Sequence, residues 1–360
     1  MGQRTRRARD RVSATSTVLS SAELASIARV IEGAGEPVVG PLSSRLITGG
    51  RSNVTYFLTD GNRRWVMRTP PRSGRTPSAH DVAREYRVTS SLLQTDVPVA
   101  PTVALCEDES VIGAPFAIAE FVPGLCVQTR EQLDELDDET VSAVAHRLVQ
   151  TLAALHRVDY DAVGLSGLGR PGGYAQRQLK RWSGQWEIVG VDPLNALAGE
   201  VSRRLAAALP EQHASSIVHG DYRIDNTILD LGADSPAARV RIAAVVDWEL
   251  STLGDPIADV AMMCAYRDPG FDLILGAPGA WSSPRLPDVP TLAAQYEAAG
   301  GVTLAHWDFH MALAYYKIAV VSAGIDHRLR AAGDPGQAHD SPGDAVEPYL
   351  ELARRALGRR

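Results

Sequence analysis

A His-Gly-Asp triplet followed by an asparagine is the part of this sequence best suited to chemistry. The triplet is His219-Gly220-Asp221, four residues separate Asp221 from Asn226, and a later apolar run ends in Asp247. In phosphoryl transfer one carboxylate orients a substrate hydroxyl and takes its proton, while amide and carboxylate oxygens hold the Mg²⁺ that bridges the nucleotide phosphates. The order and spacing of these residues therefore predict a phosphoryl-transfer site.

Two apolar stretches must position these side chains. We expect residues 217–230 and 240–247 to form a pair of short strands, joined by a turn that contains glycine and proline. Such a pair brings Asp221, Asn226 and Asp247 close together. The alternative is that all three only stabilise turns, as isolated Asp and Asn residues commonly do.

The rest of the chain divides by its hydrophobic pattern. We expect a helix at 20–33 that opens with a capping box, a second helix at 79–94, and short strands at 44–48, 54–59, 64–68, 102–106 and 116–120. After Pro123-Gly124 the pattern becomes helical, at 138–157, 174–186, 193–208, 256–266, 292–299, 306–323 and 345–357. We therefore expect an α+β protein with two lobes: a disordered basic tail at 1–18, a small antiparallel-sheet lobe at 19–121 and a larger helical lobe at 122–360.

Composition narrows the class of protein. The chain has 360 residues, of which 45% are hydrophobic and 22% charged, and its net charge is -7. These values are typical of a soluble globular protein and argue against nucleic-acid binding, which needs a basic face. No apolar run approaches the length of a membrane helix. The cysteines, Cys106, Cys126 and Cys264, are odd in number and far apart, so we expect reduced thiols and a cytoplasmic protein.

The first residues are rich in arginine. The pair Arg6-Arg7 invites comparison with a twin-arginine export signal, but polar residues follow where such a signal needs an apolar stretch. We expect either a disordered tail or a start placed too far upstream.

The motifs together carry a family resemblance. A sheet-rich lobe, a short hinge and a helical lobe with Asp, Asn and Asp in this order resemble the protein-kinase-like fold. The triplet at 219–221 resembles the aminoglycoside phosphotransferase family, which has His-Gly-Asp where protein kinases have His-Arg-Asp. More narrowly, segments 65–71 and 247–256 look like the kinase domains that also occur fused to acyl-CoA dehydrogenases. The resemblance spans residues 46–316.

The resemblance implies roles for the residues around the triplet. Asp221 is the expected catalytic base, and Asn226 and Asp247 are the expected magnesium ligands. We expect His219 to support the loop by hydrogen bonding rather than to do chemistry. Behind them, Asp255 precedes Pro256 as a helix N-cap, and Asp259, one turn inside that helix, is expected to brace the backbone of the catalytic loop.

The resemblance also implies a nucleotide site in the first lobe. Small residues between two strands resemble a nucleotide-covering loop, whose backbone N–H groups approach phosphates; the loop comprises Gly49, Gly50, Arg51, Ser52 and Asn53. The sequence has no lysine before Lys180, so Arg68 takes the place of the phosphate-binding lysine, with Glu85 as its partner. Backbone groups of Glu120, Phe121 and Val122 are expected to contact the adenine. The alternatives are a common Gly-Gly hairpin and a solvent-exposed Glu85.

Two charged clusters bear on the acceptor. Arg177, Lys180 and Arg181 share one face of a helix near Trp182 and Trp186, an arrangement suited to an anionic substrate such as a carboxylate or a CoA ester. The alternative is a surface charge patch over core tryptophans. A run of acidic residues between 131 and 139 would suit a polycationic antibiotic, but carboxylates also favour a helix start.

These observations predict an ATP- and Mg²⁺-dependent kinase that phosphorylates a hydroxyl of a small molecule, with GTP left open as the donor. By resemblance the acceptor is a hydroxyacyl-type molecule. The alternatives are an aminoglycoside or macrolide antibiotic kinase and, from another class, a nucleotide-binding pseudokinase. The oligomeric state stays open.

Overall fold

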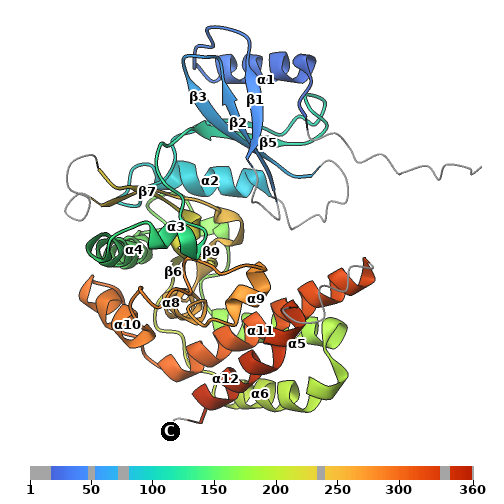
Figure 1. Ribbon diagram of the computed structural model, residues 1–360, viewed down its shortest axis with the longest axis vertical. Coiled ribbons are helices and arrows are strands. Elements are labelled where there is room, and N and C mark those ends of the chain that lie inside the picture. Colours follow the sequence, from blue (N-terminus) through green and yellow to red (C-terminus); the bar gives the residue numbers. More distant parts are fainter. Residues whose placement is uncertain (1–17, 48–52, 72–80, 233–239, 333–340, 359–360) are drawn as a thin grey trace, which may run out of the picture. The chain divides into compact units, whose positions relative to one another are not determined.

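In this computed structural model of the chain, the described residues are 18–47, 53–71, 81–232, 240–332 and 341–358. They form two compact units (Figure 1). The first comprises the described residues within Met1–Tyr86 and Thr102–Phe121, and the second those within Arg87–Pro101 and Val122–Arg360. The tail expected at 1–18 lies outside the described residues except for Val18, as do Gly49, Gly50, Arg51 and Ser52.

The first unit contains a five-stranded antiparallel sheet in the order β1-β2-β3-β5-β4. Its strands are β1 (Ser43–Ile47), β2 (Val54–Thr59), β3 (Arg64–Thr69), β4 (Thr102–Cys106) and β5 (Phe116–Glu120). Alternate residues of β3 point inward, because Trp65 and Met67 are buried while Arg64 is exposed. Helix α1 (Ser21–Gly33) packs Ile27 and Ile31 into the same hydrophobic core (Figure 1). The predicted capping box at Ser20 and Glu23 is confirmed.

Helix α2 (Val82–Leu92) begins in the first unit and ends in the second. The sequence prediction placed residues 87–101 with the first lobe, whereas the structure groups them with the second unit. The reason is packing: Val88, Leu92 and Val97 are buried within the larger hydrophobic core. The chain returns to the second unit between Phe121 and Val122.

The second unit is built mainly of helices around that core. They are α3 (Arg130–Asp134), α4 (Asp138–Arg157), α5 (Tyr174–Val189), α6 (Asn195–Ala207), α8 (Pro256–Ala265), α9 (Phe271–Leu275), α10 (Val289–Ala298), α11 (Trp307–Ala331) and α12 (Val346–Ala356). Every residue of α8 is buried, and α8 packs mainly against α11, with further contacts to α10 and β6. Among the described residues, no helix has both the length and the apolarity needed to cross a membrane.

Two small antiparallel sheets carry the catalytic motif. Strand β6 (Ser216–Val218) pairs with β9 (Thr252–Gly254), and β7 (Thr227–Asp230) pairs with β8 (Arg241–Val245). The prediction of one strand over 217–230 paired with 240–247 is therefore wrong for its first half, and β9 was not predicted. Gly220, two residues after β6, requires a residue without a side chain, since its φ is 84° and a Cβ there would lie 2.9 Å from the carbonyl oxygen of Leu250.

Candidate active site

The loop between β6 and β7 brings Asp221 and Asn226 into direct contact. The Asn226 Nδ2 donates to the backbone oxygen of Asp221 at 2.7 Å and to its Oδ2 at 3.0 Å. Both partners are acceptors, so the orientation of the Asn226 amide is fixed and its Oδ1 faces away from Asp221. The short 3₁₀ helix η3 (Ile224–Asn226) makes this turn.

Electrostatics keep Asp221 ionised. Burial favours the neutral acid, but the charge of Arg223 and the hydrogen bond of Tyr266 outweigh it, so the pKa of Asp221 is lowered. The guanidinium of Arg223 lies 3.4 Å from Asp221 Oδ2 and 2.8 Å from Asp225. The Asp221 side chain retains 20% of its accessible surface, so a substrate hydroxyl can reach it. Sequence reasoning did not single out Arg223 or Tyr266.

Both ring nitrogens of His219 are engaged. Its Nδ1 accepts from the backbone N–H of Asp221 at 3.3 Å, and its Nε2 lies 3.0 Å from the carbonyl oxygen of Val246. Since a carbonyl oxygen only accepts, Nε2 donates to Val246 while Nδ1 accepts from Asp221. The ring also packs on buried Trp248, with 4.8 Å between ring centroids. His219 therefore holds the loop in place and has no nitrogen left to accept a substrate proton.

Asp259 holds the same loop from behind. Its carboxylate accepts from the backbone N–H groups of His219 at 2.6 Å and Gly220 at 2.8 Å. His156, which sequence reasoning missed, places Nε2 3.3 Å from Asp259 and Nδ1 2.8 Å from the Tyr296 hydroxyl. Although burial alone would raise it, the pKa of Asp259 is lowered by His156, His219 and the backbone N–H of Gly220. The position of His156 at the end of the apolar face of α4 could have indicated in the sequence that this histidine is buried.

The N-cap predicted for α8 is confirmed. The Asp255 side chain accepts from the backbone N–H of Ile257 at 3.0 Å, and Pro256 occupies the first turn. This cap fixes the start of the helix that carries Asp259.

Asp247 follows β8 in an unusual backbone conformation. Its φ of 66° and ψ of 58° are left-handed, a region that Asp enters more readily than most residues. The backbone N–H of Val246 donates to the carbonyl oxygen of Asn226 at 2.9 Å, so Asp247 follows a residue paired with Asn226. Burial raises the pKa of Asp225 to about 6 against the effect of Arg223, and the charges of Asp221 and Asp247 add to the rise. Asp225 therefore lies within electrostatic reach of both Asp221 and Asp247.

The donor set fits a hard divalent cation. An amide oxygen facing away from its hydrogen-bonding partner and a carboxylate at the end of the adjacent strand are the ligand types that Mg²⁺ takes. Asn226 Oδ1 and an Asp247 carboxylate oxygen would hold such an ion. The clustering of negative charge around Asp225 favours a cation at the same place.

The residues predicted for the nucleotide belong mainly to the first unit. There Arg68 on β3 pairs with Glu85 on α2 at 3.3 Å, and the Glu85 side chain is only 8% exposed. The solvent-exposed alternative for Glu85 is thus wrong. Asn53 is buried, and its side-chain amide has no hydrogen-bond partner among the described residues. Glu120 ends β5 and is exposed, while the backbone N–H of Phe121 donates to the Arg64 carbonyl.

The three cations predicted to share one face of α5 differ in their contacts. Arg177 donates to the backbone carbonyls of Arg170 and Gly172, so its charge stabilises the preceding loop. Lys180 is exposed, and Arg181 lies over the Trp182 ring with 5.1 Å between its guanidinium carbon and the ring centroid. The two tryptophans also differ, because Trp186 is buried in the core whereas Trp182 is half-buried.

The acidic run before α4 also has structural uses. Asp137 caps α4 through the backbone N–H of Thr140 at 2.6 Å. Arg285 pairs with Asp138 at 2.7 Å and with Asp134 at 3.5 Å. These contacts favour the helix-start interpretation over a pocket for a polycation.

Comparison with known proteins places the chain in a family. The model of the phosphotransferase enzyme family (APH) matches residues 43–313. Acyl-CoA dehydrogenase family member 10 of Mus musculus is 32% identical over 324 residues, which are 89% of this chain and 30% of that protein. Family member 11 of Gallus gallus is 32% identical over 340 residues, 91% of this chain and 43% of that protein. The chain thus spans less than half the length of these curated relatives.

Solved structures confirm the predicted α+β, kinase-like fold class. The crystal structure of a putative aminoglycoside phosphotransferase from Ralstonia eutropha is 33% identical, with a TM-score of 0.77 over 93% of this chain and 98% of that one. Aminoglycoside phosphotransferase APH(4)-Ia, in ternary complex with AMP-PNP and hygromycin B, has a TM-score of 0.58 at 17% identity, over 92% of this chain and 98% of that one. At 17% identity, the similarity to APH(4)-Ia shows a shared fold only. The chain belongs to the phosphotransferase enzyme family, and within it resembles the matching part of acyl-CoA dehydrogenase family members 10 and 11.

Proposed function

We propose that this protein transfers the γ-phosphoryl group of ATP to a hydroxyl of a small hydroxyacyl-type molecule, with Mg²⁺ bound to the nucleotide. The observation that carries the proposal is the fixed contact between Asp221 and Asn226, which turns the Asn226 Oδ1 away from Asp221, in a loop whose Asn226 backbone pairs with Val246, the residue before Asp247. Family membership supports the reaction class.

Asp221 would orient the acceptor hydroxyl and accept its proton as the new oxygen–phosphorus bond forms and the bond to the leaving ADP oxygen breaks. Its lowered pKa favours orientation over early proton removal, since a weak base takes the proton late. Mg²⁺, held by Asn226 and Asp247, would neutralise the charge on the phosphates. Arg223 would keep Asp221 ionised through its charge.

In the first unit, Arg68 would bind nucleotide phosphates, with Glu85 fixing its guanidinium. The loop from Gly49 to Asn53 would cover the phosphates, and backbone groups of residues 120–122 would contact the adenine. Asn53 is buried and its side-chain amide finds no partner within the described part of the chain, which is consistent with a polar ligand contact near that loop.

The hydroxyacyl-type acceptor rests on the relatives. The names of the curated relatives describe acyl-CoA dehydrogenases, and the chain matches 30% and 43% of their lengths. An aminoglycoside acceptor has less support, because the acidic residues that would attract a polycation are used in helix caps and ion pairs with Arg285.

The test is ATP turnover against a library of hydroxy acids, hydroxyacyl-CoA esters, aminoglycosides and macrolides, read by ³¹P NMR and mass detection of the phosphorylated product. We expect Mg²⁺-dependent phosphorylation in the hydroxyacyl group alone. Turnover only with an antibiotic would overturn the acceptor class. Mg-ATP binding without turnover on any acceptor and without ATP hydrolysis would favour a pseudokinase.

A further inference from the structure

One arginine of the catalytic loop is shared between two carboxylates. A guanidinium group presents its two Nη atoms as a fork. The Nη2 of Arg223 donates to Asp221 Oδ2 at 3.4 Å, whereas its Nη1 lies 2.8 Å from Asp225 Oδ2. All three side chains are largely buried, since Arg223 retains 12%, Asp225 16% and Asp221 20% of its accessible surface. The fork is therefore divided between two carboxylates, and its shorter contact is the one with Asp225.

Two aromatic rings hold the guanidinium in this shared position. The Cζ of Arg223 lies 5.3 Å from the ring centroid of Tyr266 and 5.2 Å from that of Phe271. These rings pack on each other, with 4.5 Å between their centroids, and both residues are buried. The Tyr266 hydroxyl also forms a hydrogen bond with the Asp221 carboxylate. The two rings thus keep Arg223 close to both carboxylates.

The contact with Asp225 leaves the guanidinium able to turn. Neither the Oδ1 of Asp225 nor the Nε of Arg223 has a hydrogen-bond partner among the described residues. Arginine commonly binds one carboxylate through two parallel N–H···O bonds. In this loop the closest contact with each carboxylate instead comes from a different Nη atom. Loss of the negative charge on Asp225 would therefore favour a pair of two parallel bonds between Arg223 and Asp221.

Such a pair would disable Asp221. Its Oδ2 already accepts from Asn226 at 3.0 Å and from Arg223 at 3.4 Å. If the fork turned fully to Asp221, the second carboxylate oxygen would also be taken, and the acceptor hydroxyl would lose its partner. Asp225 opposes this turn because it holds one Nη atom. The Asp221 carboxylate then keeps an oxygen for the substrate.

We propose that Asp225 is a positioning residue that acts through Arg223: it holds one Nη atom and so prevents the guanidinium from pairing with both oxygens of Asp221. This assignment rests on the proposed function, in which Asp221 is the catalytic base. Arg223 in turn holds Asp221 through its other Nη atom without covering the carboxylate. The division of the fork is a property of the loop itself, so it can be tested by structure as well as by turnover.

The test combines crystal structures and kinetics of the full chain. In Asp225→Asn we expect both Asp221 oxygens to lie within about 3.2 Å of Arg223 nitrogens. With Mg-ATP and 3-hydroxybutyryl-CoA, kcat of this variant should fall about 10- to 100-fold, as for a charged hydrogen bond, while both KM values change by less than about threefold. Asp225→Glu keeps the charge and should keep most of kcat. Asp230→Asn is the control, because it removes a carboxylate from the pair with exposed Arg241 and should leave kcat unchanged.

A second background separates positioning from a structural role, and urea unfolding checks that each variant is folded. Arg223→Lys keeps the charge but lacks the fork, so Asp225→Asn should lower kcat by no more than about threefold in that background. Equal losses in both backgrounds, an unchanged kcat in Asp225→Asn, or a fork that stays divided in its crystal structure would overturn the proposal. If the wild-type protein phosphorylates no acceptor but the fork of Asp225→Asn pairs with Asp221, the proposed function fails and the assignment of the contacts stands. If the wild-type protein is active and the fork stays divided, only the positioning role of Asp225 fails.

Discussion

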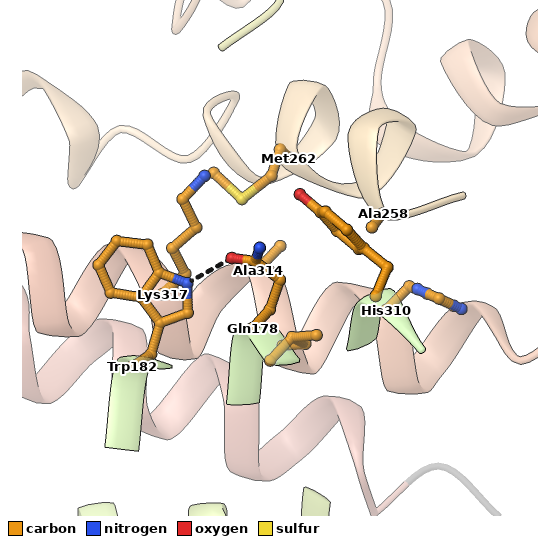
Figure 2. A pocket seen from close by; sticks show the side chains of 9 residues that line it. Gln178, Trp182, Ala258, Met262, His310, Ala314 and Lys317 are labelled. Carbon is orange, nitrogen blue, oxygen red and sulfur yellow. Dashed lines mark hydrogen bonds between the residues drawn. The ribbon is translucent and has the colours of Figure 1, made fainter. Parts of the chain in front are cut away.

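The loop that carries Asp221 and the pocket that carries Lys317 belong to the same unit but are held in different ways. The loop is fixed by hydrogen bonds to backbone groups: Asp259 accepts from two consecutive N–H groups, and both nitrogens of His219 are engaged. The pocket around Lys317 is shaped by side chains from α5, α8 and α11, most of them apolar, and Tyr174, Gln178 and His310 add polar groups to its lining (Figure 2).

Because of this difference, we expect the loop to determine whether phosphoryl transfer occurs and the pocket to determine which acceptor is used. A buried hydrogen bond to a backbone N–H group tolerates little change, because removing the acceptor leaves the buried N–H unpaired. Side chains on the faces of packed helices can change size or charge while the helices stay where they are. We therefore expect variants of the loop to abolish phosphoryl transfer and variants of the pocket to alter which acceptor is used.

The largest expected effect is that of Asp221→Asn, which removes the carboxylate and keeps the shape of the side chain. We expect kcat to fall about 10²- to 10⁴-fold, the range typical of a lost general base. Mg-ATP binding, followed by thermal shift, should persist. Glu211→Gln, which neutralises an exposed carboxylate outside the site, is the control. A small decrease in kcat would remove Asp221 from the reaction.

Next is Asp259→Asn, which tests whether the loop depends on its buried anchor. An amide can accept from one of the two N–H groups but turns its own NH₂ toward the other, so one buried donor loses its partner. We expect the free energy of unfolding to fall by about 1–3 kcal/mol. Urea unfolding measures the loss, and kcat should fall in the same variant. Unchanged stability would show that the two hydrogen bonds contribute little.

The same contrast explains how much the sequence could predict. Asp221 and Asn226 stood out by their spacing within one loop, and Asp247 stood out as the end of an apolar run. Strong periodicity placed α4, β4 and β5 at their observed bounds. The short strand β9 was missed, because three residues carry no periodicity. Its pairing with β6 depends on tertiary contacts alone.

Lys317 illustrates the other limit. Lysine occurs only at positions 180 and 317, which was visible in the sequence. The position of Lys317 beside Gly220 instead follows from the packing of α5, α8 and α11, whose residues lie far apart along the chain. Conversely, Arg177 shares a helical face with Lys180 and Arg181 yet binds loop carbonyls, because the turn before α5 folds back toward it. Helical spacing predicts which residues share a face and leaves open what that face contacts.

A change confined to the pocket should have an intermediate effect. Trp182→Ala removes an aromatic wall and the ring that faces both Lys317 and Arg181. We expect the KM for the hydroxyacyl acceptor to rise about 10-fold or more, as for a lost aromatic contact, while the KM for ATP stays the same. Steady-state kinetics with each substrate varied in turn provides the measurement. An equal rise in both KM values would indicate general damage to the unit.

The smallest expected effect separates two arginines on α5. Arg181 is exposed and contributes charge near the pocket, so Arg181→Ala should raise the KM of an anionic acceptor by at most about fivefold, and added salt should reduce the difference. Arg177→Ala instead removes donors from two backbone carbonyls, and we expect the free energy of unfolding to fall by about 0.5–1.5 kcal/mol. The two variants remove the same charge from neighbouring turns of one helix. If Arg177→Ala gave the larger and more salt-sensitive rise in KM, the cationic face predicted from helical spacing would be the acceptor site, and the pocket around Lys317 would not be.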